Sequence, residues 1–399
     1  MSEATRSGRV PEPVATAPLG EPPLALYVHL PWCVRKCPYC DFNSHALRDE
    51  LPADDYVAAL LRDLELELPL TWGRVVGSVF LGGGTPSLFD AGQVDRLLSG
   101  IRSRVTLAPD AEVTLEANPG TVEHDSFAGY RAAGINRVSL GVQSFDATLL
   151  QRIGRIHGRG EALAALASIR ASGIDNFNVD LMYALPGQRV GQALDDLRTA
   201  LEFDPPHVSH YQLTIEPNTY FHAHRPALPD DATAGAMQDR GTELLEAAGL
   251  GVYEISARAR AGRACRHNLN YWRYGDFIGI GAGAHGKLSL PARGIVQRRV
   301  RRRHPRDWMR SAGTPDGLAE VRDLPPAERV FEFFLNQLRL REGVHKAQFP
   351  ARTGMTWSTV EPRVKRLIDR GLLEDRGDCV APTATGWRFV NDLQAEFLP

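Results

Sequence analysis

The sequence predicts an α/β protein: an incomplete (β/α)6 barrel followed by a smaller α+β domain. Six apolar, β-rich runs alternate with amphipathic stretches between residues 24 and 250. Runs that are apolar on both faces are typical of parallel strands covered by helices. Most successive runs are separated by at least the roughly 30 residues that a strand and its crossover helix occupy. An open doubly wound sheet is the alternative arrangement of the same units.

The six β/α units follow one another along the chain. The predicted strands begin near Leu24, Val75, Glu112, Arg137, Asn176 and His207. The predicted helices span residues 55–68, 91–101, 121–133, 160–172, 190–201 and 232–248. Several of these helices end at a glycine, which is a common C-cap. In a barrel and in a doubly wound sheet alike, ligands bind beyond the carboxyl ends of the strands.

Three further segments flank the barrel. Residues 1–23 contain five prolines and no apolar core of a signal peptide, which predicts a disordered tail. Residues 251–324 predict a connecting segment with strand-like pieces and a Gly-rich stretch. Residues 325–399 predict a winged-helix-like domain, with helices over 325–340 and 359–370, a hairpin over 372–382 and a last helix over 385–397.

Charge and cysteine content narrow the class of protein. With 46 basic and 48 acidic residues the net charge is −2, which gives no reason to expect nucleic acid or an anionic membrane as the main partner. No apolar run approaches the ~20 residues of a membrane span. Five cysteines, an odd number, disfavour a secreted disulfide framework. The sequence therefore predicts a cytoplasmic protein.

Three of the five cysteines lie within one loop after the first strand. Cys33, Cys37 and Cys40 form a Cys-x3-Cys-x2-Cys triplet. Three thiolates so close together can surround one inorganic centre. Zinc would need a fourth ligand, for which His29 and His45 are the candidates. An iron–sulfur cube would instead leave one iron without a protein ligand, open to a substrate or cofactor.

The triplet resembles the signature of the radical S-adenosylmethionine (SAM) enzymes, including the aromatic Tyr39 before its last cysteine. In that family the open iron chelates the methionine end of SAM, and an electron from the cluster cleaves the sulfonium to give a 5′-deoxyadenosyl radical. The resemblance implies a [4Fe-4S] cluster on Cys33, Cys37 and Cys40, SAM as cofactor, and an electron donor to the cluster.

Polar or glycine residues end the later strands. These are Gly83, Gly84 and Thr85 after the second strand, Glu116, Gln143 and Asp180 after the third to fifth, and Arg155 in a following loop. The glycines lack the Lys-Ser/Thr of a phosphate-binding loop, but they allow a ligand to approach the backbone closely. A carboxylate for an ammonium and an arginine for a carboxylate suit an amino-acid head group.

This second set of residues resembles one branch of the radical SAM enzymes, the coproporphyrinogen dehydrogenase-like branch. That branch carries a tyrosine six residues before the first cluster cysteine, here Tyr27, together with Gly-Gly-Thr-Pro, Glu-x-x-Pro and Gly-Val-Gln motifs. The resemblance implies that one or two SAM molecules bind at a shared set of residues. These are Tyr27, Tyr39, Gly83, Gly84, Thr85, Glu116, Gln143, Arg155 and Asp180.

Two differences from the dehydrogenases and one shared motif indicate which group within this branch the chain resembles. The dehydrogenases have a further cysteine where this chain has Phe42, and they have a longer N-terminal extension. Both differences are typical of the sister group, the HemW-type haem chaperones, which also carry His-Asn-x-x-Tyr-Trp, found here from His267 to Trp272. The resemblance implies that His267, Tyr271 and Trp272 bind haem. An imidazole is a ready axial ligand, and aromatic rings offer flat surfaces to a porphyrin. His285 and Cys265 are further candidate ligands, and Cys379 is expected to be buried.

The expected function is thus that of a haem chaperone that transfers haem to acceptor haemoproteins. The first alternative is an oxygen-independent coproporphyrinogen III dehydrogenase, which would carry out a radical decarboxylation. The second is a nucleic-acid-binding protein that would use the winged-helix-like domain or the basic run 298–304, although that run also fits a strand with a charged exposed face or a partner for haem propionates. A homodimer is one assembly that the sequence allows.

Overall fold

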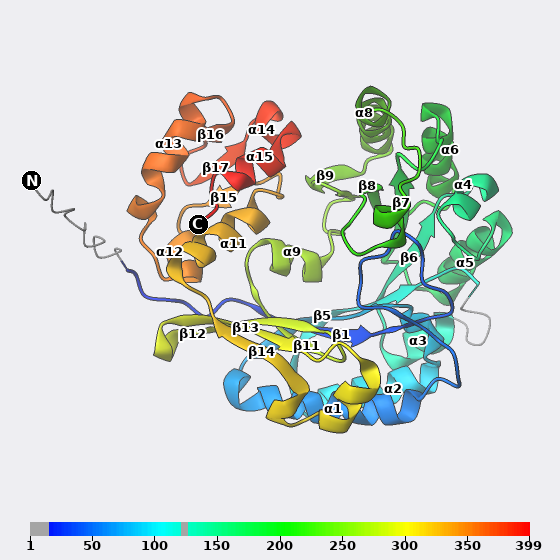
Figure 1. Cartoon of the computed structure of the whole chain (residues 1–399), viewed down its shortest axis with the longest axis horizontal. Coiled ribbons are helices and arrows are strands. Elements are labelled where there is room, and N and C mark those ends of the chain that lie inside the picture. The colour runs from blue at the N-terminus through cyan, green and yellow to red at the C-terminus, as the bar shows by residue number, and fades with distance from the viewer. Residues whose placement is uncertain (1–15, 121–126) are drawn as a thin grey trace, which may run out of the picture.

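The six predicted strands form the parallel centre of one curved sheet in the computed structural model, which describes residues 16–120 and 127–399 (Figure 1). In the described part of the chain the sheet has twelve strands, in the order β14-β13-β12-β11-β1-β4-β5-β6-β7-β8-β10-β9. The central parallel strands are β1 (Leu24–Leu30), β4 (Val75–Gly83), β5 (Thr106–Ala117), β6 (Arg137–Gln143), β7 (Phe177–Tyr183) and β8 (His207–Gln212). The sheet is open, with β14 and β9 at its two ends.

Helices cover the outer, convex side of this sheet (Figure 1). They are α1 (Ala53–Thr71), α2 (Ala91–Arg102), α3 (Phe127–Ala133), α4 (Ala147–Arg152), α5 (Arg159–Ser172), α6 (Val190–Leu201) and α8 (Asp231–Ala247). The helix predicted over 121–133 lies partly outside the described residues. The apolar faces of these helices pack on the strands to form one core, which includes Leu26, Val79, Leu140 and Val179. The predicted incomplete (β/α)6 barrel is therefore confirmed.

The segment 251–324 differs from the predicted connector, because its strands extend the sheet at both edges. Strands β9 (Gly251–Glu254) and β10 (Ala257–Ala259) continue beyond β8. The chain then crosses the concave side as α9 (Arg266–Trp272) and returns beside β1 as β11 (Asp276–Ile280), parallel to it. Strands β12 (His285–Leu290), β13 (Ile295–Arg301) and β14 (Leu318–Asp323) complete that edge, with α10 (Pro305–Ser311) between the last two. Segments at opposite edges of the sheet are thus joined through α9.

Half of the basic run 298–304 is paired with carboxylates rather than exposed. The side chain of Arg301 is fully buried and lies 2.9 Å from Asp63 and 2.7 Å from Glu67, both on α1. Arg299 pairs with the same Glu67 at 2.9 Å. Arg298 pairs with Glu332. Residues 302–304 are exposed, so the charge that the run offers to a nucleic acid is smaller than its sequence suggests.

The C-terminal domain follows the predicted order of helix, helix and hairpin. Its elements are α11 (Pro326–Gln337), β15 (Val344–His345), α12 (Gln348–Thr353), α13 (Glu361–Asp369), β16 (Leu373–Asp375), β17 (Cys379–Pro382), α14 (Ala384–Arg388) and α15 (Val390–Ala395). The helix predicted over 385–397 is interrupted at Phe389. Phe333, Phe334 and Phe349 form its core. Cys379 is half-buried rather than buried.

The predicted disordered tail is wrong for residues 16–23. The amide of Ala17 donates to the carbonyl of Gly354 at 2.9 Å, and the amide of Gly20 donates to that of Ala351 at 2.7 Å. These backbone hydrogen bonds attach the segment to the C-terminal domain before β1 begins. Residues 1–15 lie outside the described part of the chain. No helix among the described residues is long and apolar enough to cross a membrane.

Candidate functional site

The cysteine loop leaves the carboxyl end of β1 and is held by short backbone contacts. Strand β2 (Trp32–Cys33) pairs in parallel with β3 (His45–Ala46), which ties the two ends of the loop together. Within the loop the amide of Cys40 donates to the carbonyl of Cys37 at 3.1 Å. The ammonium of Lys36 donates to the carbonyls of Phe42 and Ser44 at 3.0 and 3.3 Å. The three thiols are thereby presented from one fixed turn.

The chemistry of the loop suits an iron–sulfur cluster. Cys33, Cys37 and Cys40 are free and only partly buried. Burial raises the pKa of the Cys33 and Cys40 thiols, so cationic groups are needed beside them to favour thiolates. The guanidinium of Arg155 supplies one, with Nη1 3.9 Å from Cys37 Sγ. Lys36 supplies a second, and its charge lowers the pKa of Cys40.

The arrangement is less suited to zinc. Within residues 16–120 and 127–399, no three His, Cys, Asp or Glu side chains converge as ligands of a single metal ion. A structural zinc site requires four ligands around one ion, whereas the cysteines of a four-iron cluster each bind a different iron. His29 and His45 were the candidate fourth ligands. The ring of His29 is already held between Tyr27 Oη at 3.0 Å and the carbonyl of Asn43 at 2.9 Å.

Two glycines at the end of β4 allow the loop, the sheet and a ligand to meet. Gly83 has a φ of +118°, and a Cβ there would lie 2.6 Å from the ring of His29. A Cβ on Gly84 would lie 2.5 Å from the carbonyl oxygen of Trp32. Thr85 follows, and its Oγ1 accepts a hydrogen bond from Asn118 at 2.9 Å. Only glycine permits this close packing of β4 against the cysteine loop.

Glu116 and Asp180 are two half-buried carboxylates on the inner side of the sheet. Burial raises the pKa of Glu116 to about 7, and the negative charge of Asp180 adds to this shift. The Glu116 carboxylate accepts a hydrogen bond from the amide of Gly83 at 3.1 Å. Asp180 accepts hydrogen bonds from Asn178 at 2.7 Å and Ser139 at 3.1 Å, and burial raises its pKa as well. A cationic ligand would favour the charged form of both groups.

Three predicted SAM residues do not line the pocket: Tyr39 is part of the cysteine loop, and Arg155 and Gln143 lie beside that loop. The guanidinium of Arg155 donates to the carbonyl of Gly141 and to the side chain of Asn118. Gln143, in the left-handed region at a φ of 68°, accepts a hydrogen bond from the hydroxyl of Tyr211 at 2.7 Å. Tyr39 packs into an apolar cluster, and burial raises the pKa of its hydroxyl.

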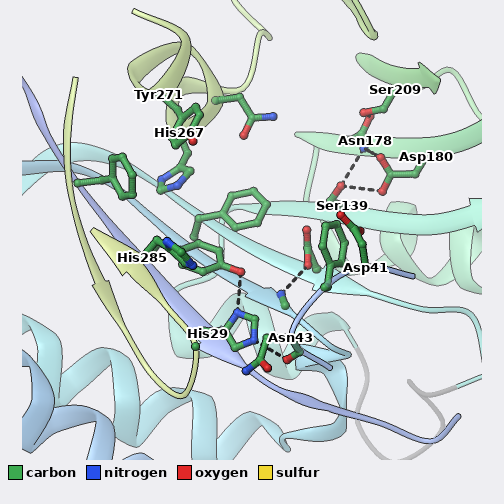
Figure 2. Close-up of a pocket in the computed structure, with 18 of the residues that line it drawn as sticks. His29, Asp41, Asn43, Ser139, Asn178, Asp180, Ser209, His267, Tyr271 and His285 are labelled. Atoms are coloured by element: carbon green, nitrogen blue, oxygen red, sulfur yellow. Dashed lines mark hydrogen bonds between the residues drawn. The ribbon is translucent and has the colours of Figure 1, made fainter. Parts of the chain in front are cut away.

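A pocket of about 690 Å³ fills the concave side of the sheet (Figure 2). Eight of the predicted site residues line it: Tyr27, Gly83, Glu116, Asp180, His267, Tyr271, Trp272 and His285. Figure 2 shows His267 and Tyr271 entering from α9 on one side, with Ser139, Asn178, Asp180 and Ser209 on the strands opposite. His29 and Asn43 lie at the end nearest the cysteine loop. The structure thus brings the predicted haem residues and four of the predicted SAM residues to one cavity, whereas the three cysteines and the other SAM residues do not line it.

The first turn of helix α9 is hydrogen-bonded to strand β5 on the concave side of the sheet. The Glu112 carboxylate on β5 accepts hydrogen bonds from the amides of Arg266 at 2.8 Å and His267 at 3.2 Å. The Nδ1 of His267 lies 3.2 Å from Ser78 Oγ on β4, and its ring packs 5.0 Å from that of Phe80. Burial, with the nearby charge of Arg137, lowers the pKa of His267 to about 3. This histidine is therefore neutral at pH 7, as a metal ligand must be.

The other end of α9 is anchored to the C-terminal domain. Arg273 pairs with Glu342 at 2.8 and 3.0 Å, and the Arg339 guanidinium lies 4.3 Å from the Trp272 ring. Tyr271 packs against Phe277 with ring centroids 5.1 Å apart. The helix that carries the predicted haem ligands is thus clamped between the barrel and the C-terminal domain.

Two further residues were candidate haem ligands. Cys265 is poorly placed to bind iron, whereas His285 is accessible from the pocket. Cys265 is 1% exposed and does not line the pocket. Burial raises the pKa of its thiol to about 12, so it is not available as a thiolate. His285 is exposed at the edge of the pocket, where burial of its ring and nearby arginines lower its pKa. Phe42, the position of the missing cysteine, also lines the pocket and is 60% exposed.

Sequence reasoning missed the polar side chains that line the pocket between the cysteine loop and α9. Ser139, Asn178 and Ser209 are inward-facing residues of neighbouring strands, and Arg137 begins β6. A sharper signal was present, because serine and asparagine alternate with apolar residues in strands that are otherwise apolar on both faces. Such polar positions in parallel strands mark the inside of a barrel that holds a ligand.

The pKa of Glu116 predicts a pH dependence. The amino group of SAM would donate hydrogen bonds to the ionised Glu116 carboxylate, so affinity for SAM is expected to increase as pH rises from 6 to 8, through the Glu116 pKa of about 7. Glu116→Gln should bind SAM at least about tenfold more weakly at pH 8 and lose this pH dependence. Isothermal titration of anaerobic, cluster-loaded protein measures both effects. Exposed Glu65→Gln is the control, and an unchanged pH profile in Glu116→Gln would contradict the assignment.

Comparison with known proteins agrees with this geometry. The Radical SAM superfamily model matches residues 27–200, and that of the HemN C-terminal domain matches residues 324–389. A protein named heme chaperone HemW from Escherichia coli (strain K12) is 49% identical over 377 residues, which cover 94% of this chain and 98% of that protein. The protein of that name from Bacillus subtilis (strain 168) is 32% identical over 378 residues, covering 93% of this chain and 98% of that protein.

A solved structure shares the fold across both domains. It is that of coproporphyrinogen III oxidase (HemN) from Escherichia coli, described as a radical SAM enzyme. Its TM-score is 0.80 at 22% sequence identity, and the match covers 94% of this chain and 90% of the other. The barrel and the C-terminal domain therefore occur together in both proteins. On the identity to its full-length relatives, the chain belongs to the HemW heme chaperone family of the radical SAM superfamily.

Proposed function

We propose that this chain binds haem in the pocket beneath α9 and transfers it to acceptor haemoproteins. The observation that carries the proposal is a neutral histidine, His267, in a cavity of about 690 Å³ lined by aromatic rings. Pockets for ligands of this size commonly measure roughly 300 to 1,000 Å³. The names of the full-length relatives support the same class of ligand.

The surroundings of His267 support its role as an axial ligand. If Nδ1 donates its proton to Ser78 Oγ, the lone pair of Nε2 is left for iron. Tyr271, Phe80 and Phe277 supply apolar ring surfaces in the same pocket. His285 at the rim is a candidate second ligand.

We assign the cysteine loop to a [4Fe-4S] cluster held by Cys33, Cys37 and Cys40. When bound, the cluster supplies an open iron for SAM and an electron that can cleave its sulfonium. Glu116 and Asp180 would accept hydrogen bonds from the amino group of SAM, and Gly83 lets that ligand approach the backbone. Arg155 would keep positive charge beside Cys37, which favours the thiolate. Tyr27 and Thr85 would lie next to the bound SAM. Gln143 and Tyr39 would pack behind these residues, outside the lining of the pocket.

The proposal includes partners beyond the ligands. Haem transfer requires acceptor haemoproteins, and reduction of the cluster requires an electron donor. We place this activity in the cytoplasm. A homodimer is part of the proposal as well, and light scattering of the cluster-loaded protein with and without haem would test it.

The haem site is tested at its proposed ligand. His267→Ala is expected to weaken haem binding at least about tenfold, because one axial bond is lost and its aromatic surroundings cannot replace it. Titration of the anaerobic protein with haem, followed by visible absorption, gives both the affinity and the shift of the Soret band. His45→Ala is the matched control, since His45 lies outside the pocket lining.

Two outcomes would overturn the proposal. An unaltered titration and spectrum in His267→Ala would remove the haem site from α9. Conversion of coproporphyrinogen to protoporphyrinogen at catalytic turnover by the reconstituted protein, with SAM and reductant, would make it a dehydrogenase instead. The exposed Phe42 at the position of the missing cysteine favours the chaperone in this comparison.

A further inference from the structure

The pocket contains one buried guanidinium whose position suits a ligand rather than the protein. Arg137, at the start of β6, is 2% exposed and lines the pocket. Its Nε has no hydrogen-bond partner among the residues that the structure describes. The one ion pair that it makes within residues 16–120 and 127–399 is long, with Nε 3.8 Å from Glu112 Oε2. A buried charged donor without a hydrogen bond is costly, so such a group is normally matched by a ligand or by water.

The neighbouring carboxylates are already committed to other groups. Glu112 accepts hydrogen bonds from the first amides of α9, through its other oxygen. Asp180 accepts hydrogen bonds from Asn178 and Ser139. The Nε of Arg137 is therefore left without a hydrogen-bonded acceptor, although both carboxylates lie nearby.

A second donor without a partner belongs to another residue that lines the pocket. The indole Nε1 of Trp272 is buried and has no hydrogen-bond partner in the described part of the chain. Among the described residues that line the pocket, Arg137 and Trp272 are the two with a buried side-chain atom in this condition, and both atoms are N–H donors. The partner that the pocket lacks is therefore a hydrogen-bond acceptor, and a carboxylate is the acceptor that best matches a guanidinium.

The position of Arg137 separates this anion from the amino-acid end of SAM. Arg137 lies six residues before Gln143 on β6, which corresponds to roughly 20 Å along the strand. Gln143 and Arg155 mark the end of the barrel where the cysteine loop lies. A carboxylate on SAM bound at an open iron would remain near that loop. We therefore assign the acceptor at Arg137 to another part of the contents of the pocket.

We infer that Arg137 binds a carboxylate of the transported ligand, which makes it a specificity-determining residue for a tetrapyrrole with propionate side chains. The inference rests on the proposed function, since it assumes haem in this pocket. A planar guanidinium can hold a carboxylate through two parallel N–H bonds. The macrocycle then lies on the aromatic side, against Tyr271 and Phe277, with a propionate directed into the barrel.

The test compares haem with its dimethyl ester, in which both propionates are blocked. Anaerobic, cluster-loaded protein is titrated with each ligand and followed by visible absorption. We expect the wild-type chain to bind haem about tenfold or more tightly than the ester. In Arg137→Gln this preference should disappear, with haem binding weakened and ester binding little changed. Arg137→Lys, which keeps the charge without the planar fork, should retain part of it.

Arg303 provides the matched control. It also lines the pocket, but it is exposed and lies toward the cysteine loop. Arg303→Gln should keep the full preference for haem over the ester. Thermal unfolding and iron content verify that each variant is folded and loaded.

The outcomes separate this inference from the proposed function. If Arg137→Gln folds and still prefers haem over the ester as the wild type does, the inference is wrong while the haem site stands. Loss of the preference in Arg303→Gln alone would reverse the orientation of the ligand. If Arg137→Gln instead loses one equivalent of bound SAM, the carboxylate belongs to a second SAM molecule and the inference is wrong. Absence of haem binding by the wild type would remove the proposed function itself.

Discussion

Cys37→Ala is expected to leave the protein with little or no iron and acid-labile sulfide after anaerobic reconstitution, against about four of each per chain in the wild type. Cys37 is central in the loop and lies beside Arg155, so its removal leaves two thiolates for a cluster that needs three. Neither Cys265 nor Cys379 replaces it, because Cys265 is buried at the start of α9 and Cys379 lies on β17. Iron and sulfide analysis, with visible absorption, gives the result directly.

The matched control for this change is Cys379→Ala. Its thiol is half-buried in the C-terminal domain, so cluster content should be unchanged. Retention of iron and sulfide by Cys37→Ala would contradict the assignment of the loop. Zinc at one equivalent per chain, without sulfide, would favour the single-ion alternative.

Arg301→Met is expected to cost about 3 to 5 kcal/mol of the free energy of unfolding at pH 7.5, because it leaves buried carboxylates without their partner. The side chain of Arg301 is fully buried and contacts both Asp63 and Glu67. Asp63 also accepts a hydrogen bond from the amide of Gly281 at 3.0 Å, and the hydroxyl of the nearby Tyr56 accepts one from the amide of Ala282 at 2.9 Å. The loss would therefore loosen the Gly-rich turn between β11 and β12. Urea unfolding followed by tryptophan fluorescence measures the change.

The same variant predicts a pH dependence of opposite sign to ordinary acid denaturation. Burial already raises the pKa of Asp63, and loss of the guanidinium raises it further. A carboxyl group with a raised pKa in the folded state binds protons more readily there than in the unfolded chain, so the deficit should shrink as pH falls from 7.5 toward 5.5. Arg302→Met, at the exposed neighbouring position, should change stability by less than about 0.5 kcal/mol. A loss of the same size in both variants would contradict the role of the buried pair.

The central sheet and its helices could be predicted from the sequence because their signals are local. Each parallel strand is a short apolar run, and each crossover helix repeats apolar residues at helical spacing. The edge strands could not be predicted in the same way. Strand β13 contains several arginines, and its burial depends on Asp63 and Glu67, more than 230 residues earlier in the chain. When the carboxylates that pair with them are not known, consecutive arginines in a sequence suggest a solvent-exposed strand face.

The candidate site was predictable to a similar degree. The cysteine spacing and the polar residues at strand ends are visible in the sequence, and the structure brings Tyr27, Gly83, Glu116 and Asp180 to one pocket with His267. Neither the burial of Cys265 nor the missing hydrogen bond of Arg137 Nε could be predicted from the sequence. Both residues lie near Glu112, which contacts α9 only because the chain crosses the concave side of the sheet.

The pairing of β1 with β11 has a consequence for synthesis of the protein. Leu24 pairs with Asp276, so the first strand to leave the ribosome waits for a partner made much later. Until then β1 presents one unpaired edge, and an exposed edge of an apolar strand is a template for association with other chains. The growing chain can build the sheet outward from β4 to β8, yet the cysteine loop at the end of β1 acquires its neighbours on the β11 side only after residues 276–280 have been made. Completion of the surroundings of this loop therefore has to wait for the synthesis of β11.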